Sequence, residues 1–424
     1  MVIDNKKYHT YLQILKEELV PAMGCTEPIA LAYCASKARD VLNAVPTHCL
    51  VEVSGNIIKN VKSVIVPNTH SLKGIEAAVA AGIIAGKTDR ILEVIADVKK
   101  EQISKIEEYL AKDCIEIKPL DSDHILDIKI TLFNNNDKVV VRIVDQHTNI
   151  ILIEKNDEKI FVKDENCKCQ KENNNRDCLN VADIYEFANT VKIDDIKATI
   201  ERQINYNSAI AKEGLENDYG ANIGSVLLKT GNDIAIKAKA MAAAGSDARM
   251  SGCELPVVIN SGSGNQGLTV SLPVIEYAKE LKVSQTKLYR ALVLANLIAI
   301  HQKSGMGRLS AYCGAVSAGC AAGCGIAYLY GGDYKCIAHT IVNSLAITSG
   351  IICDGAKSSC AAKIAASVDA GILGYRMYIE GQQFKDGDGI VKKGVENTIA
   401  NVVRLGKEGM KETDKEIIKI MTNC

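Results

Sequence analysis

Three cysteines in the second half of the chain have the spacing and surroundings of metal ligands. Cys313, Cys353 and Cys360 follow the pattern C-x39-C-x6-C and lie in runs of glycine, alanine and serine. Thiolates select soft metal centres such as iron–sulfur clusters, zinc or Cu(I). Zinc usually takes four ligands with CxxC-type spacing, which is absent here. A cluster held by three cysteines would keep one iron open, as a Lewis-acid catalyst requires.

Cys320 and Cys324 offer a rival set of ligands, because they follow Cys313 at i+7 and i+11 on one helical face. Residues seven apart are separated by about 10 Å along a helix, so such thiols converge poorly on one centre. Cys353 and Cys360 instead bracket a loop-like turn, CDGAKSSC, that could fold both thiols inward. The spacing therefore favours Cys313, Cys353 and Cys360 as the metal ligands.

Cys25 lies where a helix is predicted to begin, in the run PAMGCTEPIALAYC. Pro28 suits the first helical position, with Thr26 or Glu27 near the N-cap. The partial positive charge at a helix N-terminus favours a thiolate and lowers the pKa of a thiol, whereas the nearby Glu27 acts against this. Cys25 is thus a candidate reactive thiol, and a purely structural cap cysteine is the alternative.

A glycine-rich loop, SGSGNQG over 261–267, follows a strand-like run and precedes a predicted helix. Its glycines match the G-x-G-x-x-G of dinucleotide sites. The second strand ending in Asp or Glu is missing, because residues 283–300 have helical spacing, and we therefore reject a dinucleotide site. Backbone N–H groups and hydroxyls at a helix start can still hold an anion such as a carboxylate, although a tight turn would also need these glycines. The candidate substrate-binding residues in this loop are Ser261, Ser263, Gly264 and Asn265.

Two cations and a terminal thiol complete the list of candidates. Arg308 could bind a substrate carboxylate or offset the charge of a thiolate-bound centre, whereas Lys303 is expected to be a solvated surface charge. Cys424 ends a short tail that could reach the open iron and cap it, and a frayed tail is the alternative. Cys167 and Cys169 resemble half of a metal site whose second half is missing. The sequence assigns no role to Cys167, Cys169, Cys178, Cys320 or Cys324.

Hydrophobic periodicity divides the chain into parts that would position these residues. We expect N-terminal helices over 1–45 that pack on the catalytic domain, an α+β domain over 46–165, a polar link over 166–179, and a helical cluster-binding domain over 180–424. Within the α+β domain, the Gly55-Asn56 pair predicts a β-hairpin turn. The fold class is α+β, with a mainly helical catalytic domain of tightly packed small-residue helices and a smaller α+β domain.

Composition excludes several classes of protein. The 424 residues carry a formal net charge of −1, whereas a nucleic-acid or anionic-membrane surface would need a basic excess. No run predicts a membrane span or a signal peptide, so we expect a cytoplasmic protein. Fifteen cysteines, an odd number in a chain of this size, argue against a disulfide framework. Most of them are expected to be reduced core residues.

The motifs together resemble a known family. PAMGCTEPIALAYCASKAR, SGSGNQG, GRLSAYCGAVSAGCAAGCGIAYL and IICDGAKSSC are similar to the L-cysteine desulfidases, which are related to the alpha chain of iron–sulfur L-serine dehydratases. The resemblance covers nearly the whole chain, except for the polar stretch 163–179. It implies a [4Fe-4S] cluster on Cys313, Cys353 and Cys360, with Cys25 as the proton acceptor. The implied reaction converts L-cysteine and water to pyruvate, ammonia and hydrogen sulfide.

Other functions stay open at this point. The same cluster could act on L-serine as a dehydratase, or the protein could be a non-enzymatic iron–sulfur sensor. Against a sensor, no DNA-reading segment is visible, and a sensor does not require a helix-end thiol beside an anion loop. A zinc or cluster-free structural protein is a third alternative. The expected partner is a small amino-acid substrate, with no nucleic acid or membrane, and a homodimer stays a candidate assembly.

Overall fold

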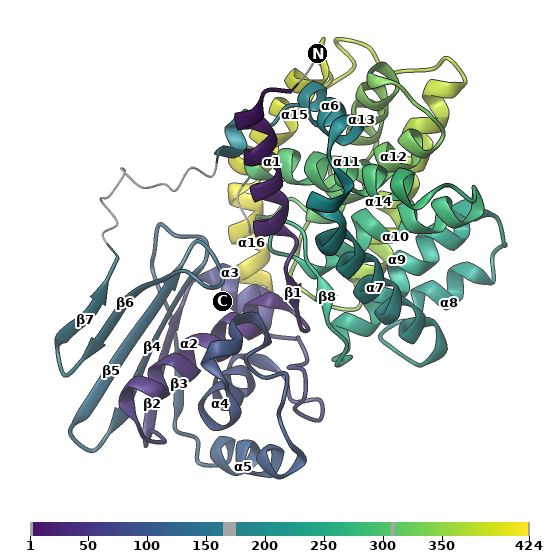
Figure 1. Ribbon diagram of the computed structural model, residues 1–424. Helices are drawn as coiled ribbons and strands as arrows, with labels where there is room; N and C mark the ends of the chain where they lie inside the picture. The colour runs from purple at the N-terminus through teal and green to yellow at the C-terminus, as the bar shows by residue number, and fades with distance from the viewer. Residues whose placement is uncertain (1–2, 164–174, 307–309, 423–424) are drawn as a thin grey trace.

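The computed structural model describes residues 3–163, 175–306 and 310–422. It consists of a large helical body and a smaller part in which helices cover a six-stranded sheet (Figure 1). The α+β class predicted from the sequence is confirmed. Among the described helices, none is both long enough and apolar enough to cross a membrane.

The smaller part is built around a mixed sheet with the strand order β3-β2-β4-β5-β6-β7. Valine and isoleucine alternate with polar residues in these strands, and the buried set packs against α2 and α4. Its elements are β2 (His48–Val53), α3 (Gly55–Val61), α4 (Gly74–Ala85), the short 3-10 helix η1 (Thr88–Glu93), α5 (Lys100–Leu110), β3 (Ile115–Pro119), β4 (Asp127–Asn134), β5 (Asp137–Val144), β6 (Ile150–Lys155) and β7 (Glu158–Val162).

The β-hairpin predicted at Gly55-Asn56 is wrong. β2 pairs in parallel with β3 and antiparallel with β4, and Ser54 is the N-cap of helix α3. Ile57 and Val61 are four residues apart and both fully buried. Their helical spacing, rather than the turn propensity of glycine and asparagine, decides the local structure.

The two N-terminal helices pack on different parts of the molecule. α1 (Asn5–Glu18) buries Tyr11 and Leu15 in the core of the helical body. α2 (Thr26–Leu42) buries Ile29 and Leu31 in the core beneath the sheet. The expectation that helices over 1–45 pack on the helical domain therefore describes α1 and not α2.

The helical body contains the remaining elements. A two-residue strand, β8 (Val257–Val258), pairs with β1 (Pro21–Ala22) from the N-terminal segment. The other elements are η3 (Asn175–Cys178), α6 (Val181–Thr190), α7 (Ile193–Glu216), α8 (Ile223–Leu228), α9 (Ile234–Met250), α10 (Gly264–Glu280), α11 (Gln285–Ser304), α12 (Gly314–Leu329), α13 (Tyr334–Thr348), α14 (Ser359–Ile379), α15 (Val395–Arg404), the π-helical turn η4 (Leu405–Gly409) and α16 (Lys411–Thr422).

Small residues let the central helices of this body approach closely. A Cβ on Gly319 of α12 would lie 2.4 Å from the backbone of Ser367 in α14. A Cβ on Gly323 would lie 2.3 Å from the carbonyl oxygen of Gly371. Backbone therefore packs directly on backbone here, as the glycine and alanine content of the segment predicts.

The cysteines without an assigned role lie in different places. Cys167 and Cys169 lie outside the described residues, whereas Cys178 is the last residue of η3.

Candidate active site

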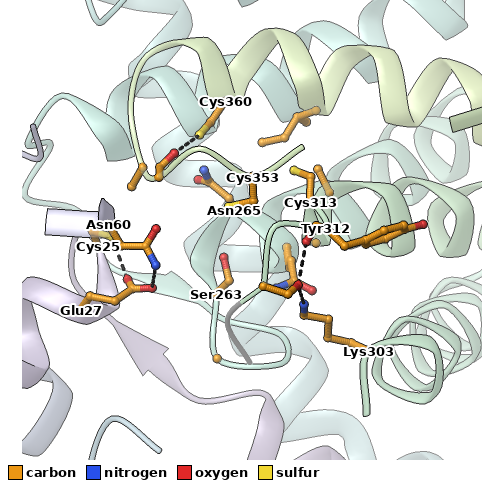
Figure 2. Close-up of a pocket in the computed structure, with 18 of the residues that line it drawn as sticks. Cys25, Glu27, Asn60, Ser263, Asn265, Lys303, Tyr312, Cys313, Cys353 and Cys360 are labelled. Atoms are coloured by element: carbon orange, nitrogen blue, oxygen red, sulfur yellow. Dashed lines mark hydrogen bonds between the residues drawn. The ribbon is translucent and has the colours of Figure 1, made fainter. Parts of the chain in front are cut away.

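Six of the sequence-predicted site residues line one pocket between the two parts of the molecule. These residues are Cys25, Ser263, Asn265, Cys313, Cys353 and Cys360. In Figure 2, Cys25 and Glu27 lie at the left, Cys353, Asn265 and Ser263 near the centre, Cys313 to the right of them, and Cys360 above. Segments from both ends of the chain thus meet around one cavity.

A short strand pair carries Cys25 to the glycine-rich loop. Pro21 pairs with Val258, and the Ile259 N–H donates to the Val20 carbonyl over 3.0 Å. The Thr26 hydroxyl then donates to the carbonyl of Gly262 over 3.0 Å. Cys25 is the N-cap of α2, so Pro28 is the third helical residue. The prediction that Pro28 takes the first helical position is therefore wrong.

Cys25 is a buried thiol held by a buried carboxylate. Its Sγ donates to Glu27 Oε2 over 3.0 Å, and Asn60 Nδ2 of α3 donates to Glu27 Oε1 over 3.4 Å. Burial and the negative charge of Glu27 raise the pKa of Cys25 well above its usual value, although Arg249 pulls it down. The expectation that the helix N-terminus lowers this pKa is therefore wrong, because burial outweighs the helix dipole.

Backbone hydrogen bonds bring Cys313 and Cys353 side by side. The Cys313 N–H donates to Ile351 O over 3.1 Å, and the Cys353 N–H donates to Ala311 O over 2.6 Å. Cys313 is then the N-cap of α12, and Cys360 is the second residue of α14. Gly355, at a φ of +91°, makes the turn between Cys353 and Cys360. The loop-like turn expected between these two cysteines is present.

The donor set of this pocket fits an iron–sulfur cluster. Burial, followed by Cys353, raises the pKa of Cys313 to about 12, and burial also raises the pKa of Cys360. A bound metal centre supplies the positive charge that removes these protons. Among the described residues, no group of three or more histidine, cysteine or acidic side chains is arranged around a single ion. Each cysteine of a cluster binds a different iron, so its ligands need not converge on one point.

Lys303 is buried in this pocket and is not the solvated surface charge that we expected. It is 4% exposed, its Nζ lies 3.4 Å from Ser310 Oγ, and burial lowers the pKa of its ammonium group. The negative charges of Cys353 and Cys313 act in the opposite direction. Lys303 and Ser310 both line the pocket.

The remaining predicted residues separate into three groups. Ser261 donates its hydroxyl to Asn260 Oδ1 and Gly264 packs against Arg249, so neither is among the residues that line the pocket. Arg308 and Cys424 lie outside the described residues, and the cap on an open iron stays a prediction. The rival ligands Cys320 and Cys324 are fully buried inside α12, away from the pocket lining.

Sequence reasoning missed one cation that lines the pocket, Arg249 at the end of α9. It is 2% exposed, and its Nη1 donates to Asn265 Oδ1 over 3.0 Å. The available signal was one arginine in a run of alanine, glycine and serine, AMAAAGSDARM, where a charge has few partners. Asn60 and His147 also line the pocket, and no sequence pattern pointed to them, whereas Gln266 lies in the glycine-rich loop but was not among the candidates.

Comparisons with known proteins show the family to which the chain belongs. Residues 89–419 match the family described as the serine dehydratase alpha chain. The chain is 65% identical to a UPF0597 protein of Desulfitobacterium hafniense, with 99% of this chain and 98% of the relative covered. It is 54% identical to a UPF0597 protein of Lachnoclostridium phytofermentans, with 98% and 100% covered, and 49% identical to one of Treponema denticola, with 99% of each covered. The chain therefore belongs to the serine dehydratase alpha chain family, and its full-length relatives are UPF0597 proteins.

Proposed function

We propose that this protein is an L-cysteine desulfidase that releases sulfide, ammonia and pyruvate. The observation that carries the proposal is the meeting of Cys25 with Cys313, Cys353 and Cys360 around one pocket. The family match indicates a lyase that acts on an amino acid, and the family is in general iron–sulfur dependent. The specific substrate and the cluster on this chain belong to the proposal.

Three cysteines would hold a [4Fe-4S] cluster, namely Cys313, Cys353 and Cys360. When bound, such a cluster supplies an iron with an open position, a Lewis acid that makes sulfur a better leaving group. Lys303 and the N-terminus of α12 place positive charge beside these thiolates, which offsets their mutual repulsion. The glycine-rich loop supports the proposal because its Ser263 and Asn265 line the same pocket as the four cysteines and can orient the substrate.

Cys25 is the proposed proton acceptor at Cα. Glu27 accepts its S–H hydrogen bond and thereby fixes the position of Sγ. The raised pKa means that the thiol must first lose its proton, but the thiolate is then a strong base, suited to a weakly acidic C–H bond. The Cα proton passes to Sγ, the Cα electron pair forms a double bond to Cβ, and the Cβ–S bond breaks. The resulting enamine becomes an imine, and water releases ammonia and pyruvate.

Anaerobic reconstitution with iron and sulfide, followed by an assay of sulfide and pyruvate from L-cysteine, tests the proposal. The Cys25→Ala variant should keep the cluster absorption and lose turnover. A Cys34→Ala variant is the matched control, because Cys34 is also a buried thiol of α2 but faces the sheet and donates to Val141 O. Retained turnover in Cys25→Ala would reject Cys25 as the proton acceptor.

The family description favours a second candidate substrate, L-serine, whose hydroxyl would leave instead of sulfide. The same pocket residues would hold it, and Cys25 would keep its role. Pyruvate release from the two amino acids at equal concentration distinguishes the candidates. A clear preference for L-serine would replace the desulfidase with a dehydratase.

A further inference from the structure

Arg249 is a buried cation without an ion-pair partner among the described residues. It lies in the last turn of α9 and is 2% exposed, yet none of the ion pairs in the part of the chain that the structure describes includes it. Asp247, two residues earlier, accepts instead from the backbone N–H groups of Ala221 and Ile223. Burying an unpaired charge is strongly unfavourable. No ion pair within the described residues offsets this charge, so an anion bound in the pocket would stabilise it.

The hydrogen bonds of the guanidinium are also incomplete. Nη1 donates to the neutral Oδ1 of Asn265, and Nε is buried without an acceptor among the described residues. Because an unpartnered buried donor is costly, a site that keeps one is expected to complete it with a ligand. Asn265 in turn holds the guanidinium beside the first turn of α10.

The start of α10 is shaped to receive this cation. A Cβ on Gly264 would lie 2.3 Å from Arg249 Nε, so any other residue would displace the guanidinium. The N-cap Ser263 makes no side-chain cap hydrogen bond, which leaves the first N–H groups of this 17-residue helix for another acceptor. The helix N-terminus and the arginine thus present positive charge to the same pocket.

The same pocket also contains a hydrogen-bond acceptor without a partner among the described residues, in addition to the unpartnered donor of Arg249. Gln266 is 5% exposed, and its Oε1 is buried without a hydrogen-bond donor among the described residues. One orphaned cationic donor and one orphaned acceptor match the two charged ends of an α-amino acid, a carboxylate and an ammonium group.

We propose that Arg249, with the N-terminus of α10, binds the α-carboxylate of the substrate, and that Gln266 accepts from its α-ammonium group. The inference rests on the proposed function for the identity of the substrate, but it concerns the binding of α-amino acids as a class. Recognition of the zwitterion holds the substrate by its α-groups, beside Cys25, which lines the same pocket. The side-chain end is then free to vary.

L-Alanine and its methyl ester are suitable probes, because both lack a leaving group and only the first carries a carboxylate. Binding to the anaerobically reconstituted protein is measured by calorimetry for wild type, Arg249→Gln, Arg249→Lys and Gly264→Ala. We expect Arg249→Gln to weaken L-alanine by about 10- to 100-fold and to leave the ester unchanged. Gly264→Ala, which displaces the guanidinium without removing it, should weaken L-alanine in the same direction. Arg249→Lys should recover part of the loss.

Arg202→Gln is the matched control, since Arg202 is half-buried and donates to the carbonyl of Leu19, away from the pocket lining. It should bind both probes as wild type does. An equal loss for acid and ester in Arg249→Gln, no loss for either, or a wild type that does not prefer the acid would overturn the inference. Sulfide release by wild type reports separately on the proposed function. Arg249-dependent binding of L-alanine without sulfide release would reject the desulfidase and keep the carboxylate site.

Discussion

Four helices that begin at the pocket differ in their N-caps from four that begin at the surface, although α4, α7 and α15 also begin at exposed residues without a side-chain cap hydrogen bond. At the surface, α1, α9, α11 and α13 begin at exposed Asp4, Asp233, Ser284 and Asp333, whose side chains accept backbone N–H groups of the first turn. At the pocket, α2, α10, α12 and α14 begin without any side-chain cap hydrogen bond. Two of the pocket N-caps are Cys25 and Cys313.

We infer that, among these eight helices, this difference separates stability from function. A side-chain cap stabilises a helix by about 1 kcal/mol, and the four pocket helices forgo it. The positive ends of their dipoles, which no capping side chain offsets, can then stabilise anions in the pocket. The anions proposed for this pocket are the cysteine thiolates and the carboxylate of the substrate. The uncapped ends are therefore expected to act on binding and the capped ends on folding.

Removal of a pocket cysteine should have the largest effect. We expect Cys313→Ala to abolish the cluster absorption and all turnover, because one of three thiolate ligands is lost. Iron content and visible absorption after anaerobic reconstitution measure this. Cys324→Ala, about three turns further along α12 and fully buried, is the control and should keep both signals. If Cys313→Ala kept the cluster, Cys313 would not be a ligand, and the N-terminus of α12 would not belong to the functional set.

The pH dependence of turnover should be the next largest effect. Burial and Glu27 raise the pKa of Cys25, so the reactive thiolate is a small fraction at neutral pH and increases with pH. The value of kcat/KM should therefore rise about tenfold per pH unit between about pH 7 and 9. Glu27→Gln removes a negative charge that raises this pKa, and the rise should then level off at lower pH. A rate that is flat over this range would contradict Cys25 as the base.

A smaller effect is expected at the pocket N-cap Ser263. Its hydroxyl lines the pocket and makes no cap hydrogen bond, so Ser263→Ala removes a ligand donor without uncapping α10. We expect KM to rise by about fivefold, with the free energy of unfolding unchanged within about 0.5 kcal/mol. Steady-state kinetics and thermal unfolding of the same preparation measure both quantities. If the variant lost stability while KM stayed unchanged, the N-terminus of α10 would serve folding, as the surface N-termini do, and not binding.

The sequence predicted the pocket better at its cysteines than at its cations. Cys313, Cys353 and Cys360 stand out because thiolates in runs of small residues are typical ligands of soft metal centres. Lys303 and Arg249 were misjudged or missed, because the burial of a charge depends on segments that are distant in the chain. Arg249 is covered by the start of α10, whose Gly264 leaves room for it.

Local patterns also predicted the helical second half of the chain, whereas the hairpin that they predicted at Gly55-Asn56 is wrong. That error has a tertiary cause, because β3 occupies the position beside β2 that a hairpin partner would take. Asn60, on the helix that forms instead, reaches Glu27 in the pocket. Because α3 was predicted as part of a hairpin, the contact between Asn60 and Glu27 could not be predicted either.

The smallest effect should come from a surface cap. Asp333 accepts the N–H of Cys336 over 2.8 Å, is exposed, and is not among the residues that line the pocket. Asp333→Ala should lower the free energy of unfolding by about 1 kcal/mol and leave KM unchanged, because the first turn of α13 loses its acceptor. Asp333→Asn should restore the stability, since asparagine caps helices about as well. Chemical unfolding followed by circular dichroism measures the first effect, and the kinetic assay the second. A change in KM at this distance would mean that capped helix ends also tune the pocket, and the separation between the two sets would fail.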